Sequence, residues 1–83
     1  MTDQEIAERV DGIMVELFEL EDDLTPNSKI YEELGLDSLD SVDMVVALEK
    51  EFNFKVVRNV DEEKIRAIRT LRDVYAFVRE KLG

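Results

Sequence analysis

The sequence predicts an all-α protein: a four-helix bundle with a long loop between the first and second helices and a short third helix. Two stretches of the chain carry apolar residues at helical spacing, and two shorter stretches open with residues that favour a helix start. Only one short segment could form a strand, and it has no partner strand. A chain of 83 residues has room for one small domain, so we expect residues 1–83 to form a single domain.

The first helix is predicted from about residue 3 to residue 19. Residues 2–5 form a capping box, with Thr2 at the N-cap and Glu5 three residues later. The apolar residues that follow recur at steps of three and four, which places them on one helical face. They are Ile6, Val10, Ile13, Leu17 and Leu20.

A long connection is predicted over residues 21–37. Pro26 cannot lie inside a helix, and turn-forming residues, among them Asp22 and Asp23, surround it. Five apolar residues should anchor this loop over the core, and a short helical turn is expected at 29–34. The anchors are Leu24, Ile30, Tyr31, Leu34 and Leu36. A loop of this length is often functional.

The second helix is predicted over residues 38–52, opened by Asp37 and Ser38 and carrying an apolar stripe. The stripe comprises Leu39, Val42, Val46 and Phe52, with Val45 and Leu48 alongside. Residues 54–60 are predicted to form a loop that packs on the helices. A short third helix is expected over residues 61–67, with acids in its first turn. Thr70, with Asp73 three residues later, starts the fourth helix.

The composition excludes several classes of function. The chain has no cysteine and no histidine, so thiolate catalysis and the commonest general base and metal ligand are missing. A net charge of -10 argues against nucleic-acid binding and favours basic protein partners. No apolar run could span a membrane, and the first ten residues lack a signal-peptide pattern. We expect a cytoplasmic protein, and a monomer.

The segment with the sequence LGLDSLDSV, residues 34–42, carries the strongest motif. Gly35, Asp37, Ser38 and Leu39 match the Gly-x-Asp-Ser-Leu motif of acyl carrier proteins, and the match continues through residues 40–52. On these residues the chain resembles the acyl carrier protein family. With the acidic first helix and the long loop, the resemblance covers almost the whole chain.

The resemblance implies that Ser38 carries 4′-phosphopantetheine through a phosphodiester, installed from coenzyme A by a phosphopantetheinyl transferase. The thiol of that arm then holds an acyl group as a thioester, and the domain presents it to enzymes of fatty acid, lipid or polyketide synthesis. The chain would be a carrier and not an enzyme, because the prosthetic group supplies the reactive thiol. A serine at a helix start also places its phosphate beside free backbone N–H groups.

Two other interpretations concern the serines of this segment. Ser38 could simply cap the second helix, since serine is a favoured N-cap residue. Ser41 lies in a similar context, between Asp40 and Val42. However, Ser41 falls one turn inside the helix and lacks the preceding loop with Gly35, so we place the attachment at Ser38.

Four acids match the acidic face with which the family docks basic patches on its enzymes: Asp37, Asp40, Asp43 and Glu49. The alternative interpretation is an ordinary solvated helix face. Residues 1–54 hold sixteen acids and three bases, whereas residues 55–83 hold five acids and eight bases. This basic second part departs from the family. It could form ion pairs within the domain or restrict the choice of partners.

The family also shelters its acyl chain between helices, and the resemblance suggests lining residues for such a groove. They are Met44, Val45, Ile65 and Ile68, for which ordinary core packing is the alternative. Glu32, Glu33 and Asp37 show no known cation-binding pattern, so we predict no metal site.

Two further functions stay open on the sequence alone. One is an aminoacyl carrier, of the D-alanyl or peptidyl kind, and the other is an unmodified acidic adaptor that only binds proteins. A hydrolase using Ser38 is rejected, because the chain has no histidine base and no Gly-x-Ser-x-Gly turn.

Overall fold

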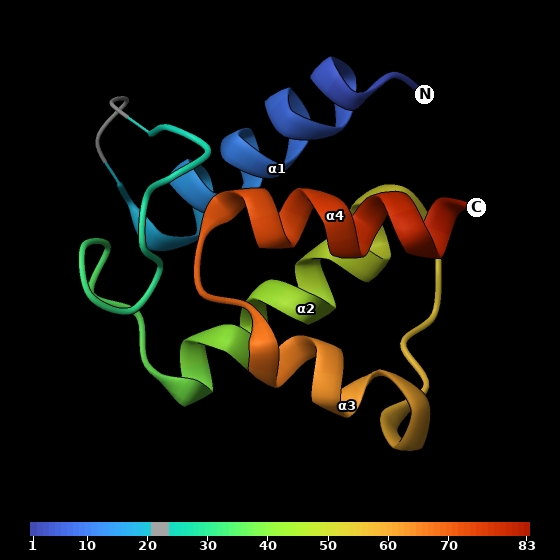
Figure 1. The fold of residues 1–83 in the computed structure, drawn as a ribbon. Helices are drawn as coiled ribbons and strands as arrows, with labels where there is room; N and C mark the ends of the chain where they lie inside the picture. The colour runs from blue at the N-terminus through green and yellow to red at the C-terminus, as the bar shows by residue number, and fades with distance from the viewer. Residues whose placement is uncertain (21–23) are drawn as a thin grey trace.

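The computed structural model describes residues 1–20 and 24–83, so part of the predicted connection, including Asp22 and Asp23, lies outside the described residues. The helices are α1 (Asp3–Phe18), α2 (Ser38–Phe52), α3 (Arg58–Ala67) and α4 (Leu71–Leu82). In Figure 1, α3 lies on the side of the molecule away from α1, and α1 packs directly against both α4 and α2. The predicted all-α fold with a short third helix is confirmed. None of the described helices has the length and apolarity to cross a membrane.

The helix starts follow the predicted capping boxes. Thr2 and Glu5 exchange side-chain and backbone hydrogen bonds at the start of α1, and Thr70 and Asp73 do the same at α4. The third helix begins at Arg58, three residues before its predicted start at Asp61. The reason is that the Asp61 carboxylate reaches back over the first turn and accepts a hydrogen bond from the N–H of Val57, at 2.8 Å.

The loop before α2 is anchored as predicted. Ile30 and Leu36 are buried, and the other three predicted anchors pack against the core. The expected helical turn at 29–34 is a single turn and does not continue as a helix, because the N–H groups of Glu33 and Leu34 both donate to the carbonyl of Lys29. The N–H of Ile30 also donates to the Arg69 carbonyl, at 2.9 Å. The loop is therefore tied to the connection between α3 and α4.

The buried face of α2 differs from the predicted stripe. Three members of the stripe, Leu39, Val42 and Val46, are 74%, 59% and 42% exposed, so this part of the stripe does not belong to the core. The residues of α2 that are buried are Ser41, Met44, Val45, Leu48 and Phe52. Both sets have helical spacing, because α2 is apolar on two neighbouring faces. Only packing against α1 and α4 decides which face is buried.

The two faces of α2 can be compared with one residue type. We expect Leu48→Ala to lower the free energy of unfolding by about 2–5 kcal/mol, because it leaves a cavity in the core. The matched variant Leu39→Ala should change it by less than about 0.5 kcal/mol. Urea denaturation of both variants measures the difference, and equal losses would contradict the assignment of the buried face.

Candidate functional site

The turn before α2 places Ser38 at the surface. Gly35 adopts a positive φ of 76°, a conformation that glycine takes without strain. Next to it Leu36 is buried, and its N–H donates to the Ile30 carbonyl at 3.2 Å. Asp37 is then the N-cap, and Ser38 is the first residue of α2, with an exposed side chain. The motif residues thus hold the serine at the end of an anchored loop.

Asp37, not Ser38, caps the helix. Its Oδ1 accepts hydrogen bonds from the N–H groups of Leu39 and Asp40, both at 2.9 Å. In return Asp40 Oδ2 accepts from the N–H of Asp37, at 3.0 Å. The interpretation of Ser38 as a plain N-cap is therefore wrong. The Asp37 carboxylate also occupies two of the backbone N–H groups that were expected to be free around Ser38.

Ser41 differs from Ser38 in what its hydroxyl does. The Ser41 hydroxyl donates to the backbone carbonyl of Ser38 at 2.7 Å, and Ser41 is buried. Hydroxyl groups bonded to a carbonyl one turn earlier are common for serines inside helices. Of these two serines, Ser38 is the one with an exposed side chain at the helix start.

A groove of about 450 Å³ runs from Ser38 between α2 and α3. Its lining residues are Ser38, Ser41, Val42, Val45, Val46, Glu49, Val56, Glu62, Ile65 and Arg66. Of the predicted lining residues, Val45 and Ile65 face this groove, whereas Met44 and Ile68 are buried in the core. Val42 and Val46, two exposed members of the predicted stripe, form much of its apolar wall.

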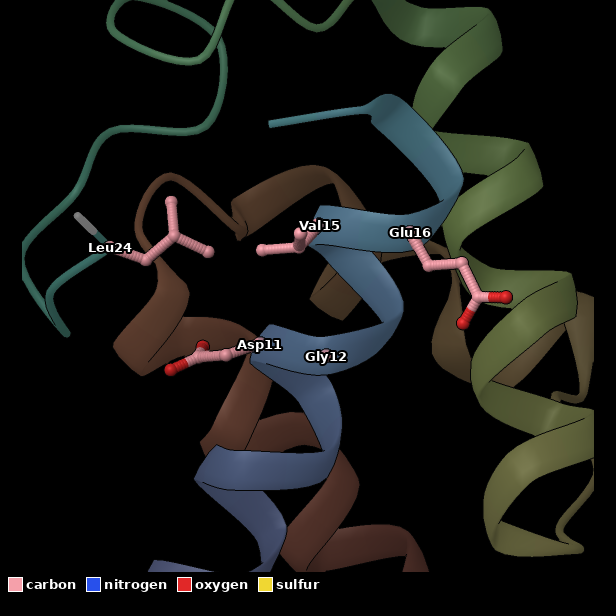
Figure 2. A pocket seen from close by; sticks show the side chains of 5 residues that line it. All are labelled: Asp11, Gly12, Val15, Glu16 and Leu24. Carbon is pink, nitrogen blue, oxygen red and sulfur yellow. The ribbon is translucent and has the colours of Figure 1, made fainter. Parts of the chain in front are cut away.

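A smaller hollow of about 240 Å³ lies beside α1 (Figure 2). Asp11 lies at its edge and accepts a hydrogen bond from the Tyr75 hydroxyl. Burial raises the pKa of Asp11, and burial together with the contact to Asp11 raises the pKa of Tyr75. These groups tie α1 to α4 and lie away from Ser38. The groove beside the serine is the more spacious of the two.

The four predicted docking acids are not equivalent. Asp37 and Asp40 belong to the capping box, and Glu49 accepts a hydrogen bond from the N–H of Val56 at 3.0 Å. Asp43 is exposed on α2, next to Val42 and one turn from Leu39 and Val46. Three of these acids thus have structural hydrogen bonds. For Glu49, the sequence spacing could not reveal this bond.

Ion pairing accounts for part of the basic second half of the chain. Lys64 pairs with Glu80, and Arg66 pairs with Glu62 at 2.8 Å. The Arg69 side chain does not pair with Asp73; its guanidinium donates to backbone carbonyls. Within the described residues, no group of three or more acidic side chains could hold a metal ion.

Comparisons with known proteins identify the family. Residues 8–78 match the family model described as the phosphopantetheine attachment site. An acyl carrier protein from Akkermansia muciniphila is 34% identical over 84 residues, covering all of both chains. This chain belongs to the acyl carrier protein family. Acyl carrier protein 2 from Ralstonia nicotianae is 35% identical over all of this chain and 99% of its own.

The structural comparison agrees with the family assignment. An acyl carrier protein from Thermotoga maritima is 36% identical over 96% of this chain and 95% of its own. The crystal structure of an acyl carrier protein from the same organism superposes with a TM-score of 0.77 and 26% identity, over 96% of this chain and 89% of that chain. The predicted fold, carrier function and covalent 4′-phosphopantetheine are confirmed, and the chain is a carrier protein and not an enzyme.

The cap at α2 gives a test of what Asp37 does. We expect Asp37→Ala to lower the free energy of unfolding by about 1 kcal/mol, because two backbone N–H groups lose their acceptor. Asp43→Ala removes the same charge from the same helix without removing a cap, and should leave the free energy of unfolding nearly unchanged. Thermal and urea denaturation measure both. Equal effects would mean that Asp37 acts only as a surface charge.

Proposed function

We propose that residues 1–83 act as a single acyl carrier domain and that Ser38 is the attachment residue for 4′-phosphopantetheine. The observation that carries this proposal is the contrast between the two serines of the motif. The Ser38 side chain is exposed beside the groove, whereas the Ser41 hydroxyl is bonded to a backbone carbonyl and buried. When bound, the group supplies the thiol that carries the acyl thioester. The chain's own residues position and shelter the cargo.

Loading by a transferase tests the attachment residue. Incubation with coenzyme A and a broad-specificity phosphopantetheinyl transferase should add one phosphopantetheine to the wild type and to Ser41→Ala, and none to Ser38→Ala. Intact mass measures the addition. Loading of Ser38→Ala but not of Ser41→Ala would contradict the assignment. A wild type that no transferase loads would favour the protein-binding adaptor.

The groove beside Ser38 supports a hydrocarbon cargo. Val42, Val45, Val46 and Ile65 give it an apolar wall, against which an acyl chain can be removed from water. An aminoacyl cargo carries a charged amine and gains less from such a wall. The lining therefore favours the acyl class, from fatty acid, lipid or polyketide synthesis, over the D-alanyl and peptidyl classes.

The surface around Ser38 also supports a docking role toward the transferase and the acyl-transferring enzymes. Leu39, Val42 and Val46 form an exposed apolar row on α2, and Asp43 lies beside it with an exposed carboxylate. An apolar patch with charge at its margin is typical of protein-binding surfaces. Partner enzymes with basic patches would complement this surface. We propose that the protein meets them as a monomer in the cytoplasm. Of the four predicted docking acids, Asp43 is the one that takes part neither in the capping box nor in the contact to Val56.

A charge reversal tests this surface. Asp43→Lys should slow transferase loading by about threefold or more at low salt, because opposite charges accelerate the encounter of the partners. The control Glu8→Lys makes the same charge change at an exposed position of α1. Loading rates at two salt concentrations measure the effect, which should shrink at high salt. Equal rates for the two variants would place the docking surface elsewhere.

A further inference from the structure

The helix α3 forms one wall of the groove but has little apolar attachment of its own. Of the α3 side chains that the structure describes, only Asp61 is buried, with 1% exposed. Ile65 is half-buried, and Val60 is exposed. Amphipathic helices are normally held by an apolar stripe. The end of α3 is held by Ile65, which packs against the core, and by Ile68, which is buried at its C-cap. What holds the start of α3 must be sought among its polar contacts.

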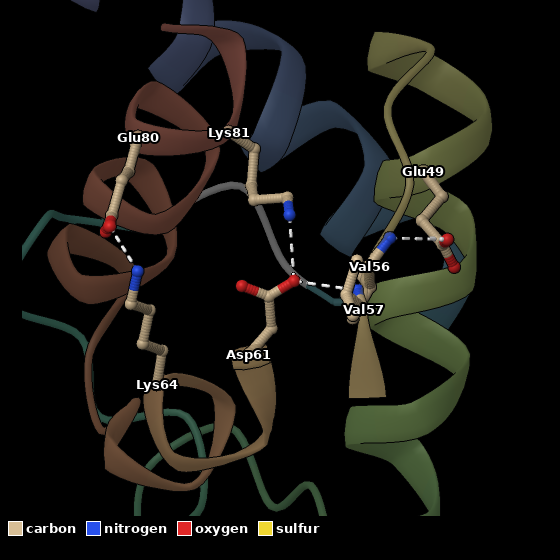
Figure 3. A network of polar contacts seen from close by, with 7 residues as sticks. All are labelled: Glu49, Val56, Val57, Asp61, Lys64, Glu80 and Lys81. Atoms are coloured by element: carbon tan, nitrogen blue, oxygen red, sulfur yellow. Dashed lines mark hydrogen bonds and ion pairs between the residues drawn. The ribbon is translucent and has the colours of Figure 1, made fainter. Parts of the chain in front are cut away.

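Figure 3 shows a polar network at the start of α3. Asp61 Oδ2 accepts hydrogen bonds from Lys81 Nζ of α4 and from the N–H of Val57, both at 2.8 Å. On the other side, Glu49 of α2 accepts from the N–H of Val56, at 3.0 Å. The start of α3 is thus connected to α4 through a side chain and to α2 through the preceding loop.

The Asp61–Lys81 pair differs from the other ion pair between α3 and α4. Its side chains are 2% and 19% exposed, whereas those of Lys64 and Glu80 are 44% and 58% exposed. Surrounding water and salt screen an exposed pair much more than a buried one. The bonds from Lys81 and Val57 lower the pKa of Asp61, so its carboxylate is charged near neutral pH.

We propose that Asp61 is a positioning residue for the acyl cargo: its buried ion pair with Lys81 holds α3 against α4 and so sets the width of the groove beside Ser38. Glu62, the next residue, and Ile65, one turn further, line the groove from α3. A shift of the start of α3 therefore moves the wall that faces α2. This inference rests on the proposed role of Ser38 and its groove.

Loosening α3 should leave the bundle folded. Most of the fully buried core side chains, such as Met14, Leu48 and Val74, come from α1, α2 and α4, and Ile30 comes from the loop before α2. The variant Asp61→Asn keeps an acceptor for the Val57 N–H but removes the charge that holds Lys81. The long side chain of Lys81 can then turn to water. We expect the groove to widen while the rest of the fold remains.

The experiment uses holo-protein loaded with a decanoyl or an acetyl thioester. In Asp61→Asn, amide hydrogen exchange in residues 58–67 should accelerate by about tenfold or more, with the core amides unchanged. Cleavage of the decanoyl thioester by hydroxylamine should accelerate by about threefold or more, because local opening exposes what the groove shelters. The acetyl thioester, too short to be sheltered, should be cleaved at the wild-type rate.

Two further variants test the role of the Asp61–Lys81 pair, and the loading of the wild type tests the proposed attachment at Ser38 separately. Glu80→Gln breaks the exposed pair between α3 and α4 and should leave both rates near those of the wild type. Lys81→Gln tests the same contact from the other side, should Asp61→Asn fail to fold. Unchanged cleavage of the decanoyl thioester in a loaded variant would overturn the role of Asp61. Failure to load the wild type at Ser38, seen by intact mass, would overturn the proposed function instead.

Discussion

The site depends on the hydrogen bonds that Asp37 makes at the start of α2. The carboxylate accepts hydrogen bonds from two backbone N–H groups, so the first turn is capped without the side chain of Ser38. Leu36, buried one residue earlier, fixes where that turn begins. Because Leu36 and Asp37 stabilise the helix start, the Ser38 side chain can be exposed there and need not contribute to stability. A side chain that does not stabilise the fold can be modified, or left unmodified, without changing the fold.

The second constraint is that α2 is apolar on two faces and has only one to bury. One face packs against α1 and α4, and the other remains at the surface as the row formed by Leu39, Val42 and Val46. Exposed apolar side chains at such density are unfavourable in an isolated protein. Beside Ser38 they offer a wall to a hydrocarbon cargo and an apolar patch to a partner. The exposed row is therefore unfavourable for solubility but is available to a cargo or a partner.

Local signals made most of the fold predictable. The capping boxes at Thr2 and Thr70 involve residues three apart, and Pro26 acts on its own segment, so the sequence contains all that is needed. What it could not reveal depends on contacts between distant segments. The early start of α3 requires Asp61 to bond back to a residue with no capping side chain. The choice between the two apolar faces of α2 requires the positions of α1 and α4.

The same distinction applies to the site. Ser38 follows from a motif that lies entirely within one segment, whereas the hydrogen bond that Glu49 accepts from the N–H of Val56 depends on how the following loop folds back on α2. The Asp37 carboxylate accepts from the N–H groups of Leu39 and Asp40, so these two donors are not available to a phosphate on Ser38. An arm attached at this exposed residue would be joined to the helix by one bond, while the groove beside Ser38 offers its cargo an apolar wall.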